Sequence, residues 1–241
     1  MSEHVNELGQ PVGAPLTIAL PRPRPPRTPM RGRWCDVVPL DPDAHAKALH
    51  TAYAADTEGR IWTYLPYGPF ATLADYQEWL ESVSRPQDPL FHAIVDLDSG
   101  RAVGVASYLR IQPGHGSIEV GHINFAPPLQ RKPAATEAMY LLMKRAFEAG
   151  YRRYEWKCDA LNQRSRAAAQ RLGLSFEGIF RQATVYKGRN RDTAWYAAID
   201  SEWPALSQAF EHWLNPANFS ADGQQRVRLS ELTSRILVAR G

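Results

Sequence analysis

The spacing of apolar residues along the chain predicts a domain that mixes strands and helices. Apolar or alternating runs predict strands at about 33–40, 90–97, 102–111, 117–125, 151–159, 175–186 and 192–200. Apolar residues three and four positions apart predict helices at about 43–54, 72–83, 134–149, 163–172 and 203–213. The strands and helices up to residue 200 follow the order β-α-α-β-β-β-α-β-α-β-β, which indicates the α/β (α+β) class.

The two ends of the chain differ from this central domain, which we assign to residues 31–214. Residues 1–30 form an arm that contains the Pro/Arg-rich run 21–27, which cannot form a helix and has little to bury. We expect the arm to be extended or disordered, or to lie as a strap on the surface. Residues 215–241 are expected to form a polar linker and an amphipathic helix over about 224–239.

Composition is that of an ordinary globular protein. The chain has 241 residues, of which 44% are hydrophobic, which is enough for one domain with a sizeable core. Two cysteines are too few for a disulfide framework and suit a reducing compartment. Since the chain shows neither a signal-peptide pattern nor an apolar run that could span a membrane, we expect a cytoplasmic protein without a membrane partner.

One segment, 129–138 (LQRKPAATEA), combines the features of an anion-binding turn. It follows a strand-like run and opens the helical pattern at 134–149. The first N–H groups of a helix lack partners within the helix and point outward with the positive end of its dipole. Arg131 and Lys132 add charge at the same place. The segment therefore predicts a phosphate or pyrophosphate site, with an ordinary solvated turn as the alternative.

A second motif follows the strand at 151–159. It consists of Asn162-Gln163-Arg164-Ser165 and, after a short helix, Leu172-Gly173-Leu174. In order, spacing and context the two motifs resemble those of the GCN5-related N-acetyltransferase (GNAT) superfamily, and within it the RimJ/RimL type. The resemblance covers about residues 31–203. It implies a GNAT fold, with a mixed, mostly antiparallel sheet of about seven strands, flanked by helices and splayed between its fourth and fifth strands.

The resemblance also implies that acetyl-CoA lies in the notch made by the splay. Family members hold the pyrophosphate on a Q/R-x-x-G-x-G/A turn, in which Pro133 here replaces the first glycine. Proline suits a first helical turn but removes one N–H donor, so we expect the basic residues of the turn to compensate. The residues assigned to acetyl-CoA in this way are Phe125, Ala126, Gln130, Arg131, Lys132, Pro133, Ala134, Ala135, Thr136, Asn162 and Ser165.

Acetyl transfer to an amine needs a base for the amine, donors for the developing oxyanion, and a hydrogen bond for the leaving thiolate. By resemblance Ser165 lies near the departing sulfur, and the tyrosine that many acetyltransferases use as an acid is Ala169 here. The alternative is that Asn162 and Ser165 belong only to a helix cap. For the base we favour Glu119, acting through water, over His122, since residues three apart on a regular strand face opposite ways unless a bulge intervenes. No metal is expected.

The acceptor is expected to be a primary amine, either on a protein N-terminus or in a small amine or amino acid. An aromatic loop at 61–70 and a hairpin near 187–191 are expected to bind it, with core packing or a surface role as the alternative for each residue. The candidate substrate-binding residues are Trp62, Tyr64, Tyr67, Arg181, Gln182 and Tyr186.

Two other functions are compatible with the sequence. Pro133 in the phosphate turn suits a non-catalytic CoA-binding module, and the Pro/Arg-rich arm suits a ribosome- or RNA-associated protein. A net charge of only +3 argues against nucleic acid as a direct partner. The expected C-terminal helix and the late hairpin leave room for a homodimer.

Overall fold

A computed structural model describes residues 4–241, so the first three residues of the predicted arm lie outside the described residues. Within the described residues the main sheet has eight strands in the order β3-β4-β5-β6-β7-β8-β10-β9, and β1 pairs with β2 in a separate hairpin. Neighbours in the main sheet are antiparallel except for β7 and β8. The strands are β1 His4–Val5, β2 Pro11–Val12, β3 Met30–Arg31, β4 Cys35–Pro39, β5 Leu90–Asp96, β6 Arg101–Gln112, β7 Ser117–Phe125, β8 Arg153–Asp159, β9 Ser175–Tyr186 and β10 Arg189–Ile199.

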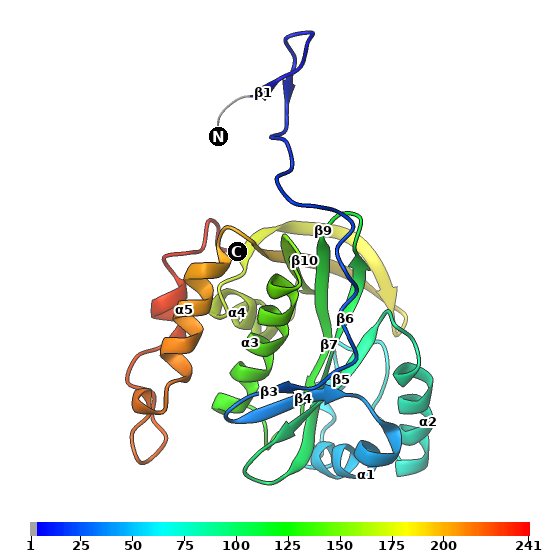
Figure 1. Cartoon of the computed structure of the whole chain (residues 1–241). Coiled ribbons are helices and arrows are strands. Elements are labelled where there is room, and N and C mark those ends of the chain that lie inside the picture. The colour runs from blue at the N-terminus through cyan, green and yellow to red at the C-terminus, as the bar shows by residue number, and fades with distance from the viewer. Residues whose placement is uncertain (1–3) are drawn as a thin grey trace.

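Helices cover both faces of this sheet (Figure 1). The helices α1 and α2 pack on one face, against β6 and β5, whereas α3 and α4 pack on the other and α5 lies against α3. None of the helices in the described part of the chain is both long and apolar enough to cross a membrane. Their bounds are α1 Pro42–Tyr53, η1 Arg60–Trp62, α2 Leu73–Ser84, α3 Pro133–Glu148, α4 Gln163–Arg171, α5 Trp203–Leu214, η2 Pro216–Asn218 and α6 Leu229–Thr233.

Side chains at the N-caps determine where α1, α2 and α4 begin. Asp41 accepts hydrogen bonds from two N–H groups of the first turn of α1, Thr72 accepts one from α2, and Asn162 accepts one from α4. The N-cap of α3 is Lys132, which makes no such bond within the described residues. In the described chain the first turn of α3 is therefore without a side-chain cap, although the Ala135 N–H donates to the carbonyl of Lys132 at 3.2 Å.

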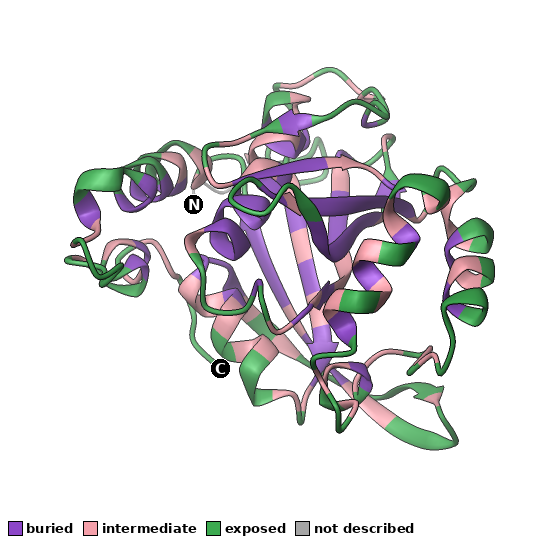
Figure 2. Ribbon diagram, turned by 90° about the horizontal axis from the view of Figure 1, so that it is seen from below, coloured by how far each residue is buried: buried purple, intermediate pink, exposed green. Residues whose placement is uncertain are grey.

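The two faces of the sheet have separate hydrophobic cores. Between the sheet and α3, α4 and α5 the core includes Tyr108, Leu142 and Tyr196, and between the sheet and α1 and α2 it includes Tyr53, Tyr76 and Leu80. Figure 2 shows that the buried residues follow the central strands while the exposed ones lie on the outer sides of the helices and loops. The central strands of the sheet are thus buried on both sides.

The predicted splay lies between β7 and β8. These two strands pair only from Ser117 with Arg153 to Val120 with Trp156 and separate beyond that point. Without the two-residue edge strand β3, the main sheet of the described chain consists of the seven strands β4 to β10. Along the chain β7 and β8 are the fourth and fifth of these, so the predicted fold is confirmed. A register shift between β6 and β7 and a positive φ of 50° at His122 mark a β-bulge where the strands part.

Much of the N-terminal arm follows the surface of the domain as a strap, one of the arrangements expected from the sequence. The guanidinium of Arg145 donates to the carbonyls of Thr28 and Pro29 at 2.6 and 2.9 Å, and the Tyr151 hydroxyl donates to that of Pro23 at 3.0 Å. Earlier residues leave the surface, so that the β1–β2 hairpin projects from the domain (Figure 1).

The C-terminal helix predicted over 224–239 is wrong in extent, because α6 spans only Leu229–Thr233. Asn218 bonds to both backbone groups of Val227, which holds the chain extended before the helix. After the helix the chain turns back to β9, where the N–H of Phe176 donates to the carbonyl of Ala239. Of the apolar residues that suggested a long helix, Leu229 is buried, and Leu232 and Ile236 are partly buried against the same core.

Candidate active site

The turn between β7 and α3 is an exposed, basic loop above the notch. Arg131 and Lys132 are exposed, and Pro133 is the first residue of α3, as its fixed φ favours. Arg131 has a φ of 62°, a left-handed conformation that is unfavourable for a residue with a Cβ. Gln130 folds back, and its side-chain amide donates to the carbonyl of Phe125 at 2.9 Å. Carbonyls of the turn engage the N–H groups of Gln130, Lys132 and Ala135, so the turn offers charge together with the N–H groups of Arg131 and Ala134.

The next residues of α3 point into the protein. Ala134, Ala135 and Thr136 are buried, and the Thr136 hydroxyl accepts a hydrogen bond of 2.7 Å from Arg171 on α4. Glu137 accepts hydrogen bonds from the backbone N–H groups of residues 33–35, and thereby fixes the start of β4. The backbone of this segment, and not its side chains, remains for contact with an anion.

The second motif brings Asn162 and Ser165 to the N-terminus of α4. The Asn162 side-chain oxygen accepts a hydrogen bond of 3.1 Å from the Ser165 N–H, and so caps the helix as the alternative interpretation expected. The Asn162 NH2 group has no protein partner in the described chain. The Ser165 hydroxyl accepts a hydrogen bond of 3.0 Å from the indole N–H of Trp156. Trp156 is the last residue of β8 that pairs with β7. Ser165 therefore lies where the notch opens, on the α4 side.

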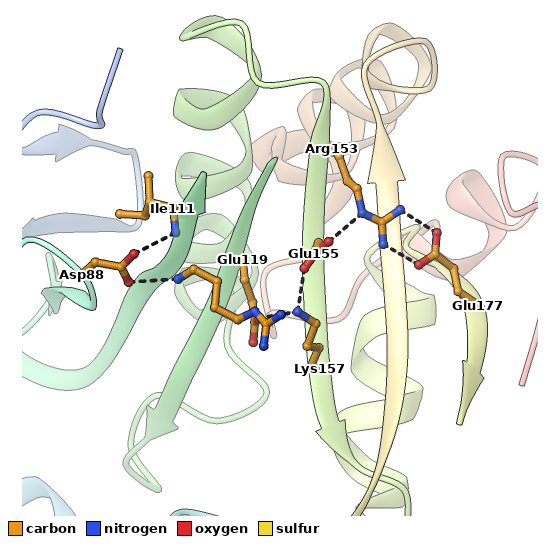
Figure 3. Close-up of polar contacts among 8 residues, drawn as sticks. Asp88, Ile111, Glu119, Arg153, Glu155, Lys157 and Glu177 are labelled. Carbon is orange, nitrogen blue, oxygen red and sulfur yellow. Dashed lines mark hydrogen bonds and ion pairs between the residues drawn. The ribbon is translucent and has the colours of Figure 1, made fainter. Parts of the chain in front are cut away.

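On the opposite face of the sheet Glu119 belongs to a buried ion cluster (Figure 3). The Lys157 ammonium lies 2.8 Å from a carboxylate oxygen of Glu119 and 2.7 Å from one of Glu155. The Arg110 guanidinium lies 3.5 Å from the same oxygen of Glu119. Burial raises the pKa of Glu119, and the charge of Lys157 opposes this. Hydrogen bonds from Arg153 and Lys157 outweigh burial at Glu155 and lower its pKa.

The bulge brings His122 to the same face as Glu119, which a regular strand would not do. Its Nδ1 lies 3.2 Å from the Tyr67 hydroxyl, and its ring stacks on Tyr67 and lies against Phe91. Burial lowers the pKa of His122 to about 4, so the ring is neutral near pH 7. Since His122 lies beyond the last residue of β7 that pairs with β8, it borders the notch more directly than Glu119 does.

The end of β7 is held from the other side. The N–H of Ala126 donates to the carbonyl of Val103 at 3.0 Å, and the Tyr53 hydroxyl donates to the carbonyl of Asn124 at 3.0 Å. The edge of β7 that faces β8 beyond Val120 makes no strand pairing in the part of the chain that is described. The backbone groups on that edge, apart from the Phe125 carbonyl that Gln130 already engages, are thus available to a ligand.

Three of the predicted substrate residues gather at the mouth of the notch. The Tyr186 hydroxyl donates to Asp159 at the end of β8 at 2.8 Å, and the Tyr64 hydroxyl lies 3.4 Å from the carbonyl of Leu161. Tyr67 contacts His122, as described above. Lys187, which sequence reasoning did not select, donates to the carbonyl of Trp62 at 2.8 Å and so joins the hairpin to the aromatic loop.

The other three predicted substrate residues are not brought to the notch in the same way. Trp62 is 5% exposed and packs edge-on against Tyr53 and Phe70, so the core alternative describes its side chain. Arg181 and Gln182 are exposed on β9, which β10 separates from β8. The backbone N–H of Gln182 donates to the carboxylate of Asp192 at 2.7 Å.

Sequence reasoning missed Trp156 and Lys157, which lie next to each other where the strands part. Alternation along β8 sends their side chains to opposite faces, Trp156 to Ser165 and Lys157 to Glu119. The signal that could have found Lys157 is a lysine between apolar positions of a central strand, since such residues are rarely buried without a partner. Together these contacts give the notch a hydrogen-bond donor on one side and a neutral imidazole with a compensated ion cluster on the other.

Comparison with known proteins relates these features to a family. A family model described as an acetyltransferase (GNAT) domain matches residues 37–175, which is more than half of the chain. A GCN5-related N-acetyltransferase from Brucella melitensis is 46% identical, with a TM-score of 0.89, over 91% of this chain and 100% of that chain. A probable acetyltransferase of the GNAT family from Chromobacterium violaceum is 42% identical, with a TM-score of 0.73, over 81% and 100%. No curated protein matches the chain.

A more distant likeness bears on the predicted RimJ/RimL type. The structure of RimL, the ribosomal L7/L12 alpha-N-protein acetyltransferase, is 21% identical, with a TM-score of 0.61, over 71% of this chain and 93% of that one. At this identity the likeness concerns the fold alone.

Proposed function

Because this chain belongs to the GNAT acetyltransferase family, we propose that it transfers the acetyl group of acetyl-CoA to a primary amine by direct attack in a ternary complex. Acetyl-CoA, the acetyl donor of the family, supplies an activated acyl group, so that an acyl–sulfur bond is exchanged for an acyl–nitrogen bond. The observation that carries the proposal is the notch between β7 and β8, with Ser165 on one side and His122 on the other.

The residues present fit acetyl-CoA. The N–H groups at the start of α3 have no side-chain cap among the described residues, and Arg131 and Lys132 stand beside them, so they would hold the pyrophosphate even with Pro133 in the turn. The free edge of β7 and the NH2 group of Asn162 would hold the pantetheine arm. Backbone N–H groups on that edge would also stabilise the developing oxyanion.

For the base we propose His122 in preference to Glu119, the residue favoured by the sequence alone. Glu119 is engaged by Lys157 and Arg110, whereas His122 is neutral and its Nε2 has no protein partner in the described chain. Nδ1–H would donate to the Tyr67 hydroxyl oxygen, which leaves the Nε2 lone pair to accept the proton of the amine. The Ser165 hydroxyl would donate a hydrogen bond to the departing sulfur.

We further propose that the enzyme is of the RimJ/RimL type and acts in the cytoplasm. Two residues support the assignment to the RimJ/RimL type. Many other acetyltransferases place a tyrosine acid at the position of Ala169, whereas this chain has Ser165 one turn earlier, which makes the RimJ/RimL type the closer likeness. The acceptor would be a protein N-terminus or a small amine, with Tyr64, Tyr67 and Tyr186 around its carbon skeleton.

The proposal is tested by incubating the purified protein with acetyl-CoA and a panel of amines. The panel contains peptides with free N-termini, amino acids and polyamines, and both CoA release and the mass of each amine are followed. We expect at least one amine to gain one acetyl group for each CoA released. A protein that binds acetyl-CoA but acetylates no member of the panel would instead support a CoA-binding module.

A further inference from the structure

The hydrogen bond between Trp156 and Ser165 determines what the serine hydroxyl can do. An indole N–H only donates, so the Ser165 oxygen must be the acceptor in their 3.0 Å contact. Its own hydrogen therefore points elsewhere and is free to be donated. Trp156 is 5% exposed and is held by strand pairing to Val120, so its N–H is a fixed donor, not a mobile one.

The face of β8 that carries Trp156 also carries a buried thiol. Trp156 and Cys158 are two residues apart on β8 and so lie on the same face of the sheet, which α4 covers. Burial raises the pKa of the Cys158 thiol. The serine hydroxyl thus accepts one fixed N–H at the place where the notch opens, and its own hydrogen remains to be donated.

We propose that Trp156 is a positioning residue that orients the Ser165 hydroxyl so that it donates to the departing sulfur of CoA. This role rests on the function proposed above. The indole N–H also polarises the hydroxyl and strengthens it as a donor, since hydrogen bonds in a chain reinforce one another. The acyl–sulfur bond breaks with its electron pair on sulfur, the hydroxyl keeps its proton, and the proton lost by the amine goes to the base.

The test compares Trp156→Phe with Trp213→Phe as a matched control. Trp213 is also 5% exposed and donates its indole N–H to Gln225 at 2.8 Å, but it lies on α5, away from the notch. The readout is the pKa of the thiol of bound CoA, followed by the ultraviolet absorbance of the thiolate, with the same protein bound to desulfo-CoA subtracted. This measurement requires neither turnover nor a known acceptor.

We expect Trp156→Phe to raise the pKa of the bound thiol by about 0.5 to 1 unit relative to the wild type, because a weaker donor stabilises the thiolate less. Trp213→Phe should leave it unchanged. With the best amine of the panel, Trp156→Phe should lower kcat about three- to tenfold and change the KM for acetyl-CoA less than about twofold. In a Ser165→Ala background the substitution should have no further effect on kcat.

If Trp156→Phe leaves both the thiol pKa and kcat at wild-type values, the role of Trp156 is wrong. If Trp156→Phe does not fold, a benzothienylalanine at position 156 keeps the ring shape, lacks the N–H and should give the same shift. A wild-type protein that acetylates no amine would overturn the proposed function, while the titration would still test the hydrogen bond. Absence of CoA binding would overturn both.

Discussion

Two side chains of β7, His122 and Glu119, lie on the same face of the sheet in different electrostatic surroundings. Glu119 is surrounded by cations, one of which, Lys157, is only 6% exposed. His122 is surrounded by aromatic rings. Removing the charge of Glu119 leaves Lys157 with fewer partners, whereas changing His122 breaks no ion pair. The two residues should therefore respond differently to substitution.

We expect His122→Gln to lower kcat/KM about tenfold to a hundredfold, with little change in stability, because a positioned base contributes on this scale. Glu119→Gln should instead lower the free energy of unfolding by about 3 kcal/mol. Since the pKa of His122 is lowered to about 4, protonation of this base should reduce activity only as the pH falls toward that value, and not between pH 8 and 6.

The measurements are pH profiles of kcat/KM and urea unfolding curves for both variants, with the exposed His115→Gln as control. A loss of activity in Glu119→Gln larger than that in His122→Gln, at conditions where both remain folded, would return the role of base to Glu119.

At the scale of elements, the turn before α3 combines a strained backbone with charge. The side chain of Arg131 suits an anion, while its left-handed φ suits glycine. We expect Arg131→Gly to raise the free energy of unfolding by about 1 kcal/mol through relief of strain. The same substitution should weaken acetyl-CoA binding about three- to fivefold through loss of charge.

Urea unfolding and calorimetric titration with acetyl-CoA measure these two opposite effects, and Arg101→Ala removes an exposed charge from a strand end as the control. If acetyl-CoA affinity is unchanged in Arg131→Gly, the turn does not hold the pyrophosphate.

How far the sequence predicted each element depended on whether the responsible interaction was local. Caps such as Asp41 and Asn162 and the period of apolar residues are local, and the helices they predict agree with the structure to within a few residues. The bulge at His122 arises from register with β6, and the end of α6 from contacts of Asn218 and β9 with distant residues. Such tertiary contacts leave no pattern in the segment itself.

At the scale of the candidate site the same distinction holds. The phosphate turn and Ser165 belong to compact motifs and could be selected from the sequence. Lys187, Trp156 and Lys157 acquire their roles only when the hairpin, α4 and β7 come together. Trp62 was selected for its aromatic character, which serves the core equally well.

At the scale of the whole molecule, Arg145 of α3 holds the strap formed by the N-terminal arm against the domain. We expect Arg145→Ala to lower the free energy of unfolding by about 2 kcal/mol, because carbonyls of the strap lose a charged donor. Binding of acetyl-CoA should be unaffected. Lys144→Ala, which removes a long and exposed ion pair with Glu148 and a distant contact of the ammonium with the Tyr140 ring, is the control for urea unfolding. Equal stability of the two variants would mean that the strap is not stabilising.

The arrangement of the strap also bears on the alternative of an RNA-binding arm. The guanidinium of Arg27 donates to carbonyls of Ser84 and Arg85 at the end of α2, so this arginine is already engaged by the domain. A charge used in this way is less available to phosphates. The structure thus gives the Pro/Arg-rich run a role within the fold.

The central claim, that acetyl transfer takes place in the notch beside Ser165, is tested most directly by one kinetic comparison. Acetylation of the best amine of the panel is measured for the wild type, Ser165→Ala and Ser207→Ala, a control on α5 outside the notch. We predict that Ser165→Ala lowers kcat about a hundredfold while the Kd for acetyl-CoA changes less than about threefold, and that Ser207→Ala behaves as the wild type. Wild-type kcat in Ser165→Ala would contradict the account.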